Sequence, residues 1–197
     1  MIQDRQIIIG IAGRKGAGKD TAARKLVSHY GFTVVKFATP LKQMTEAYLR
    51  SCGVGLETID RLVNGDLKEV PNAHFQGLTS RYFQQKLGTE FGRELIGDRI
   101  WIDAFKAACY GHPRIVNTDL RFPNELDCIS LEMNGTTLKV ADPNFVKPEH
   151  DHPSEAFIDD MHCDIVMWND KTKRTADEFS DDVIELLLKL KVVNNDY

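Results

Sequence analysis

The feature that most constrains this 197-residue chain is a glycine-rich loop close to its N-terminus. An apolar run at residues 7–12 leads into Gly13-Arg-Lys-Gly-Ala-Gly-Lys-Asp-Thr21, and good helix formers follow. The run is rich in isoleucine, which is typical of a strand buried on both faces of a parallel sheet. A strand, a glycine turn and a helix in this order predict an anion-binding loop, because backbone N–H groups and the positive helix end face one point.

The side chains of the loop indicate that the anion is a nucleotide phosphate. Lys19 would bring a full positive charge to the β- and γ-phosphates. Asp20 stands where the usual motif has serine or threonine, and the hydroxyl comes one position later, on Thr21. We therefore expect Mg²⁺ to be bound largely through water, with Asp20 or Thr21 touching it. The structural alternative, a turn without a ligand, does not explain a lysine placed directly after the glycines.

Charge and cysteine usage narrow the class of protein. The formal net charge of −4 argues against generic binding to nucleic acid or to an anionic membrane, both of which need a basic face. The four cysteines are scattered without a CxxC pair, as in a reduced cytosolic protein. The opening apolar stretch is too short for a signal peptide or a membrane span. We predict a cytoplasmic protein with small-molecule partners, no direct nucleic acid and no membrane.

The order of the predicted elements indicates an α/β fold with a five-stranded parallel sheet and helices on both faces. A helical block at about 40–112 is too long for a crossover, and we interpret it as an insertion that builds a substrate site. A polar loop follows at about 142–153. The expected strands span 7–12, 32–37, 114–119, 136–141 and 164–168, and the expected helices span 19–30, 41–50, 80–95, 98–108, 124–133, 154–161 and 175–190.

A second group of polar residues closes the third predicted strand. Asp119 stands at its carboxyl end, where a carboxylate can organise Mg²⁺ or bind substrate. Arg121 would project from the same edge and could hold a phosphate with two hydrogen bonds. The alternative is a strand-end aspartate that caps the next turn beside a surface arginine. The glycine loop favours the functional interpretation.

Two further groups have both a functional and a structural explanation. Residues 85–93 and Trp101 could form a wall on which a base stacks, or an amphipathic helix pair with core aromatics, and the second is favoured without other context. Lys36 and Lys42 flank the turn after the second strand and could face an acceptor phosphate or simply be solvated.

A cluster of histidines and a cysteine raises the question of zinc. His150, His152, His162 and Cys163 lie close together in the sequence. Their spacing matches no known ligand pattern, so a polar loop explains them better than a zinc site does.

Together these residues resemble the bacteriophage deoxynucleoside monophosphate kinases, in the P-loop nucleoside monophosphate kinase group. The match runs in order over nearly the whole chain. Its most specific pieces are the Lys-Asp-Thr ending of the loop and the segment 119–125. The matching blocks are 13–21, 37–42, 87–90 with Arg93 and Trp101, 119–125, 152–155 and 165–169.

The resemblance implies a P-loop NTPase-type three-layer fold in a single kinase domain spanning 1–197. The insertion at about 40–112 would bind the nucleoside monophosphate, and the loop at about 142–153 would be lid-like. ATP, with Mg²⁺, would phosphorylate a deoxynucleoside monophosphate (dNMP) to the diphosphate for phage DNA precursor synthesis in the host cytoplasm. A homodimer is an assembly that the resemblance allows.

The resemblance also assigns roles to individual residues. Catalysis would fall to Lys19, Asp119 and Arg121, and Mg²⁺ to Asp20 and Thr21. The ATP phosphates would be held by Gly13, Lys15, Gly16, Ala17, Gly18, Lys19, Asp20 and Thr21. The dNMP would be contacted by Lys42, Arg93, Trp101, Asp119 and Glu125. The loop at 142–153 lacks the lid arginines of many such kinases, so these would come from Arg81, Arg93 or Arg99.

Two other functions stay open at this point. One is a P-loop kinase for another small phosphorylated acceptor, of the phosphomevalonate or dephospho-coenzyme A type. The other is a nucleotide-binding regulatory switch with slow hydrolysis. A switch should hydrolyse ATP at the same rate with or without a dNMP, whereas a kinase should need the acceptor.

Overall fold

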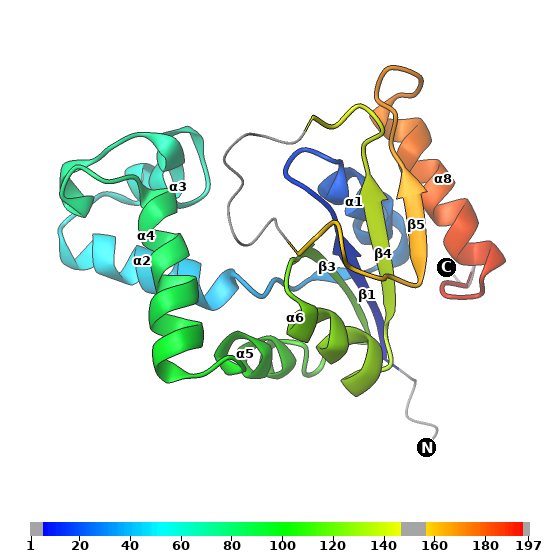
Figure 1. Ribbon diagram of the computed structural model, residues 1–197, viewed down its shortest axis with the longest axis horizontal. Helices are drawn as coiled ribbons and strands as arrows, with labels where there is room; N and C mark the ends of the chain where they lie inside the picture. The colour runs from blue at the N-terminus through cyan, green and yellow to red at the C-terminus, as the bar shows by residue number, and fades with distance from the viewer. Residues whose placement is uncertain (1–5, 147–156, 195–197) are drawn as a thin grey trace. The chain divides into compact units, whose positions relative to one another are not determined.

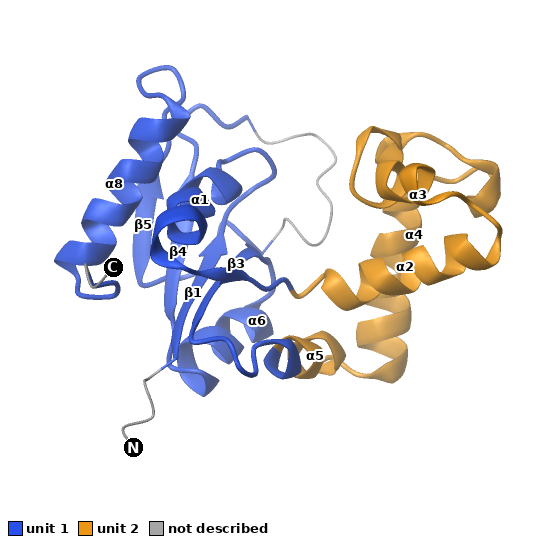
Figure 2. Ribbon diagram, turned by 180° about the vertical axis from the view of Figure 1, so that it is seen from behind, with its two compact units in different colours: residues 1–36, 106–197 blue, residues 37–105 orange. Residues whose placement is uncertain are grey.

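The computed structural model describes residues 6–146 and 157–194, and the chain divides into two compact units (Figure 2). The first unit comprises Met1–Lys36 and Lys106–Tyr197, and the second comprises Phe37–Phe105. The second unit overlaps the predicted insertion, whose role in binding substrate stays a prediction. Most of the predicted lid-like loop, part of the predicted helix 154–161, and both His150 and His152 lie outside the described residues.

The first unit contains a five-stranded parallel sheet (Figure 1). The strand order is β2-β3-β1-β4-β5, so the strand that leads into the glycine loop is central. This order confirms the predicted α/β fold with five parallel strands. The strands are β1 (Ile7–Ala12), β2 (Thr33–Val34), β3 (Arg114–Leu120), β4 (Thr136–Ala141) and β5 (Ile165–Trp168).

Strand β2 is shorter than the predicted strand 32–37. The N–H of Val35 still donates to the carbonyl of Val116, at 3.1 Å. The carbonyl of Val35, however, accepts from the side-chain amide of Asn117 at 3.0 Å. The buried Asn117 side chain thus replaces the backbone N–H that would continue the strand pairing, and β2 ends there.

Helices cover both faces of the sheet, as predicted (Figures 1 and 2). Because side chains alternate along a strand, Ile9 and Ile11 point to one face, where they share a core with α1 and α8. Gly10 points to the other face, and a Cβ there would lie 2.6 Å from Cδ1 of Ile129. The absence of a side chain at this position lets the π-helical segment η4 (Cys128–Glu132) approach β1 closely.

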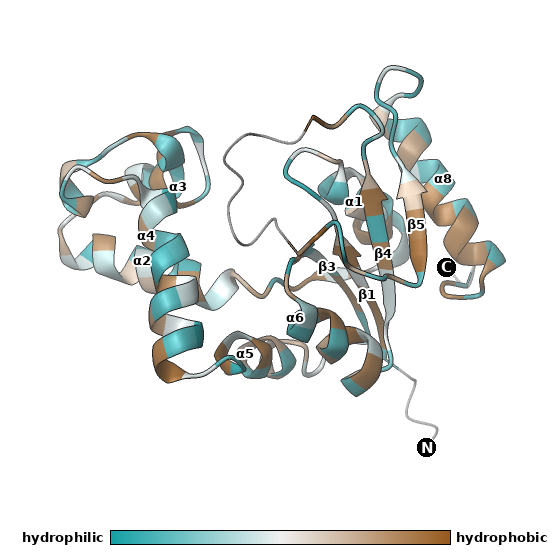
Figure 3. Ribbon diagram, in the orientation of Figure 1, coloured by the Kyte–Doolittle hydropathy of each residue, from teal (hydrophilic) through white to brown (hydrophobic). Residues whose placement is uncertain are grey.

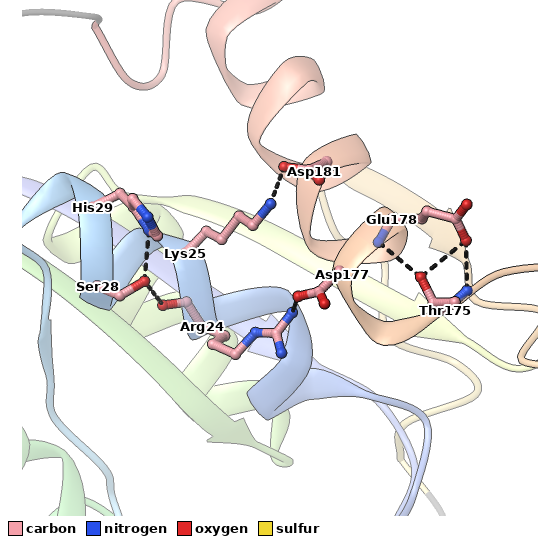
Figure 4. Close-up of polar contacts among 8 residues, drawn as sticks. All are labelled: Arg24, Lys25, Ser28, His29, Thr175, Asp177, Glu178 and Asp181. Carbon is pink, nitrogen blue, oxygen red and sulfur yellow. Dashed lines mark hydrogen bonds and ion pairs between the residues drawn. The ribbon is translucent and has the colours of Figure 1, made fainter.

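The last helix, α8, begins at the capping box predicted for it. Thr175 accepts a hydrogen bond from the N–H of Glu178, and the Glu178 carboxylate accepts from the N–H of Thr175 at 2.7 Å (Figure 4). Arg24 and Lys25 pair with Asp177 and Asp181 of α8 in the same view. Among its described residues, this unit has the α-helices α1 (Lys19–Tyr30), α6 (Pro123–Asp127) and α8 (Ala176–Lys189).

Apolar and polar residues alternate along α8, as expected for a helix with one face on the core (Figure 3). Phe179, Val183, Ile184 and Leu187 are the buried apolar members of this face. Within residues 6–146 and 157–194, no helix is both long and apolar enough to cross a bilayer.

The second unit is helical and has its own small core. Leu49, Leu62 and Phe75 are buried in it. The ring of Phe83 lies 5.1 Å from that of Phe75 and stacks at 5.4 Å on the ring of Tyr48. The elements are α2 (Thr39–Ser51), α3 (Leu56–Val63), the 3₁₀ turns η1 (Asp66–Glu69) and η2 (Ala73–Phe75), α4 (Ser80–Lys86), the π-helical segment η3 (Leu87–Ile96) and α5 (Ile100–Ala108), whose last residues enter the first unit.

The predicted helix 80–95 is not a regular α-helix throughout, because Trp101 packs against its second half. The indole N–H of Trp101 donates to the carbonyl of Gly88 at 2.8 Å, and the ring lies so close to Gly92 that a Cβ there would be 2.4 Å from it. The N–H of Gly97 bonds to the carbonyl of Gly92, five residues back. This wider spacing defines a π-helix.

Candidate active site

The glycine loop joins β1 to α1 and adopts a backbone shape that only glycine accepts easily. Gly13, Gly16 and Gly18 have φ values of +153°, +81° and +109°. A Cβ on Gly13 would also lie 2.5 Å from the carbonyl oxygen of Val140. The predicted strand, glycine turn and helix are therefore all present, and α1 begins at Lys19.

Lys19 is folded into this loop. Its Nζ donates to the carbonyl oxygens of Gly13 at 2.7 Å and Arg14 at 2.9 Å, and the residue is only 9% exposed. The ammonium group is thus held by the loop backbone at the N-terminus of α1. Because the lysine charge and the helix end have the same sign, an anion at this point would be attracted by both.

Asn169 fixes the loop from the other side, and the sequence analysis gave it no role. Its side-chain amide donates to the carbonyl of Ala17 at 2.9 Å, and its backbone N–H donates to the carbonyl of Ala141 at 2.8 Å. A Cβ on Gly18 would lie 2.4 Å from the same amide nitrogen. The signals in the sequence were an asparagine that directly follows the last strand and its place in the matching block 165–169.

Asp20 extends from the first turn of α1 as a largely exposed carboxylate. It accepts hydrogen bonds from the Thr118 hydroxyl at 2.8 Å and from the Lys36 ammonium at 3.3 Å. Burial by itself would raise the pKa of Asp20, but these two donors and the charges of Lys36 and Lys19 lower it below its usual value. The carboxylate is therefore ionised at neutral pH, as a magnesium ligand must be. Thr21 follows it in the helix and is half-buried.

The carboxyl end of β3 carries Asp119, which is half-buried and has Asn117 as a partner. The Asn117 amide donates to the Asp119 carboxylate at 2.7 Å, and the N–H of Asp119 donates back to the Asn117 side-chain oxygen at 3.1 Å. These reciprocal bonds hold the carboxylate at the sheet edge where the sequence predicted it. Arg121 follows two residues later and is also half-buried.

Glu125 has a structural role that the sequence analysis did not assign. Only 3% of it is exposed, and its carboxylate accepts from the N–H groups of Arg121 at 2.9 Å and Phe122 at 3.2 Å. It therefore caps the N-terminus of α6. A proline at the first helical position, Pro123, two residues before a glutamate could have indicated this cap. A contact between Glu125 and a dNMP stays a prediction.

The remaining predicted substrate residues belong to the second unit. Lys42 donates to the side-chain oxygen of Asn64 at 2.9 Å, and Arg93 donates to the carbonyl of Asp98 at 3.5 Å. Trp101 is only 3% exposed, so its indole packs inside the unit in the way that the alternative explanation expected. Base stacking on Trp101 stays a prediction.

The other two arginines named as substitutes for lid arginines, Arg81 and Arg99, also lie in the second unit and face acidic partners. Arg81 pairs with Glu69, and Arg99 lies 3.9 Å from the carboxylate of Asp103. Their roles in catalysis stay predictions.

A pocket of about 240 Å³ opens beside the glycine loop within the first unit. Its wall combines three basic side chains, two acidic ones and two aromatic rings. It is lined by Arg14, Lys15, Ala17, Lys139, Val140, Ala141, Asp142, Phe145, Ile158, Asp159 and Trp168.

No group of three or more histidine, cysteine, aspartate or glutamate side chains lies close enough to hold a metal ion in the described part of the chain. Of the residues considered for zinc, only His162 and Cys163 fall in that part. The arrangement at Asp20 suits Mg²⁺, which proteins commonly hold by one or two carboxylates together with substrate phosphates and water.

A curated relative from Acanthamoeba polyphaga mimivirus, named "Putative deoxynucleotide monophosphate kinase", is 31% identical over 196 residues. The match covers 90% of this chain and 94% of the relative. Among solved structures, TT1252 from Thermus thermophilus is 18% identical with a TM-score of 0.49, covering 94% of this chain and 98% of that one. A dephospho-CoA kinase from Campylobacter jejuni is 12% identical with a TM-score of 0.48, covering 93% and 96%. No protein-family model matches the chain.

Proposed function

The chain belongs to the deoxynucleotide monophosphate kinase family, and on that basis we propose that it transfers the γ-phosphate of ATP to a deoxynucleoside 5′-monophosphate. The products would be ADP and a deoxynucleoside diphosphate. A role in phage DNA precursor synthesis in the host cytoplasm rests on the resemblance of the motifs alone. A homodimer rests on the same ground.

The observation that carries the proposal is the position of Lys19. Its ammonium lies within a loop whose glycines have positive φ values, at the N-terminus of α1. On binding of ATP, the phosphates would replace the two carbonyl oxygens as partners of this ammonium. The adjacent pocket has a volume of about 240 Å³ and the rings of Phe145 and Trp168 in its wall, and it would take the apolar part of the nucleotide.

Mg²⁺ would be held by Asp20 and Thr21 together with the ATP phosphates, where it would neutralise negative charge on the transferring group. Thr118 and Lys36 support this role because they keep the Asp20 carboxylate ionised and oriented. No cage of protein ligands is required for such a site.

Asp119 and Arg121 at the end of β3 would supply a carboxylate held by Asn117 and a guanidinium for the acceptor. The family resemblance also assigns Lys42, Arg93, Trp101 and Glu125 to the dNMP. The assignment of these residues to the dNMP rests on the family resemblance.

The mechanism needs positioning and charge neutralisation more than bond-making groups. The acceptor phosphate is already anionic near neutral pH, so no strong general base is required. An acceptor oxygen attacks the γ-phosphorus in line with the bond to the leaving β-phosphate oxygen. Lys19 and Arg121 would stabilise the charge that spreads over the γ-oxygens during transfer.

An acceptor panel tests the proposal. Purified protein is assayed for ADP release with ATP and Mg²⁺ in the presence of each dNMP, each ribonucleotide counterpart, dephospho-CoA, phosphomevalonate or no acceptor. We expect release to depend on a dNMP. Release that is equally fast without an acceptor would indicate a switch, and release only with a different acceptor would refute the proposed substrate.

A matched pair of variants tests the site itself. Lys19→Met should reduce turnover by a factor of about 100 or more without unfolding the protein, because it removes a charge that stabilises the transition state. Lys25→Met in the same helix is the control, since Lys25 pairs with Asp181 of α8 instead. Near-normal transfer by the Lys19 variant would contradict the assignment of the loop.

A further inference from the structure

Arg14 is the second residue of the glycine loop. Its side chain makes contacts that phosphate binding does not require. Only 7% of the surface of Arg14 is exposed to solvent. Nε and Nη2 donate to the two carboxylate oxygens of Asp159 at 2.9 and 2.5 Å, so the guanidinium forms a bidentate pair. Its carbon atom Cζ also lies 4.6 Å from the centre of the Phe145 ring.

The two partners of Arg14 come from different segments of the chain, and each is anchored elsewhere. Phe145 ends a turn in which its N–H donates to the carbonyl of Asp142 at 3.1 Å. Asp159 follows the fully buried Ile158, and its carbonyl accepts from the Lys139 ammonium at 2.6 Å. All five of these residues line the pocket together with Arg14.

The backbone of Arg14 belongs to the phosphate site at the same time. Its carbonyl accepts from Nζ of Lys19 at 2.9 Å and from the N–H of Ala17 at 3.1 Å. Arg14 thus makes two sets of contacts. Its backbone carbonyl contacts Lys19, which would meet the ATP phosphates, and its side chain contacts Phe145 and Asp159 in the wall of the adjoining pocket.

We propose that Arg14 is a positioning residue that sets the affinity for ATP by holding Phe145 and Asp159 in the pocket wall against the phosphate loop. The inference rests on the proposed function only in taking ATP as the nucleotide. Since its guanidinium lies on the Asp159 carboxylate and the Phe145 ring, we assign Arg14 to the pocket wall and not to phosphoryl transfer. It should therefore affect ATP binding and leave the chemical step unchanged.

Arg14→Lys is the sharpest perturbation, since lysine keeps the charge but cannot form the planar fork or stack on the ring. We expect the Kd for ATP, measured by isothermal titration calorimetry, to rise about tenfold, as for the loss of one charge-assisted contact. The KM for ATP should rise in parallel, while kcat at saturating ATP and the KM for the acceptor stay within about twofold.

Two further variants separate positioning from general stability. Asp159→Asn weakens the same pair from the other side, and the double variant should bind ATP no more weakly than the Arg14→Lys single variant, since one interaction is lost. Arg24→Lys is the control, because Arg24 pairs with Asp177 of α8 and does not line the pocket. The thermal midpoint of Arg14→Lys should resemble that of the control, as Asp159 is half exposed.

The outcomes are distinct. Unchanged ATP affinity in both Arg14→Lys and Asp159→Asn overturns the inference, and so does an equal loss of ATP binding, acceptor binding and thermal stability, which marks a purely structural residue. If Arg14→Lys does not fold, Asp159→Asn alone decides between these results. Failure of the unaltered protein to bind ATP would instead refute the proposed function, and with it this inference.

Discussion

Replacing Gly18 with alanine should destabilise the protein by about 2–5 kcal/mol, in two separable parts. The first part is backbone strain: Gly18 has φ +109°, and an L residue held with positive φ costs roughly 1–2 kcal/mol. The second part is steric. The new Cβ would lie 2.4 Å from the Asn169 amide nitrogen, so the amide must move and its 2.9 Å bond to the Ala17 carbonyl is lost. Leaving a buried polar group without its partner costs about 1–3 kcal/mol.

Three companion variants separate these parts. Gly16→Ala is the matched control, because Gly16 has φ +81° but a Cβ there would meet no atom within 4 Å, so it should lose only the strain energy. Asn169→Ala should lose only the hydrogen-bond part. The double variant of Gly18 and Asn169 should be less destabilised than the sum of its single variants by about 1 kcal/mol or more, because the same hydrogen bond cannot be lost twice.

Urea unfolding followed by far-ultraviolet circular dichroism measures these differences, provided that the m-values agree among the variants. Equal losses in the Gly16 and Gly18 variants would refute the steric argument. Single-variant losses at Gly18 and Asn169 that add to within about 0.3 kcal/mol would refute it as well.

Three further predictions concern other parts of the molecule. Gly92→Ala should lower the free energy of unfolding by about 1–3 kcal/mol, because the new Cβ would overlap the Trp101 ring. An unchanged free energy of unfolding in thermal denaturation would refute this packing. The pKa of Asp20 lies below its ordinary value of 3.8. The Asp20 carboxylate therefore contributes fully to the free energy of unfolding above pH 3.8, and this contribution is lost as the pH falls through the lowered pKa. Asp20→Asn should therefore flatten the fall in the urea midpoint below about pH 4, and an unchanged slope would contradict this. Iodoacetamide at about pH 8 should modify the exposed Cys52 of the folded protein and spare Cys109, whose pKa is raised by burial to about 12; equal labelling in peptide mass spectra would contradict this.

Much of the first unit was predictable because its signals are local. The isoleucine run, the glycines and Lys19 stand within thirteen residues, and each acts on its immediate neighbours. The Thr175 and Glu178 box likewise fixed the start of α8 from a four-residue pattern. The parallel sheet followed from the alternation of strands and helices, and the structure confirms it.

The roles of the substrate residues were harder to predict from the sequence, since burial decides what a polar or aromatic side chain can do. The sequence left Trp101 between base stacking and core packing, and the structure shows it packed on Gly88 and Gly92. Glu125 was assigned to the dNMP by resemblance, which stays a prediction, and the structure adds that its buried carboxylate caps α6. This cap is local and could have been recognised from the proline that precedes it.

The sequence by itself thus determined the strand, the glycine loop and the helix that starts at Lys19, because their signals come from neighbouring residues. Only the tertiary structure decided what holds that loop in place. Asn169 reaches the loop from 152 residues away, and Arg14 meets Asp159 across 145 residues. No periodicity in a sequence reports such pairings, because they arise when the sheet brings the carboxyl ends of its strands together at one edge.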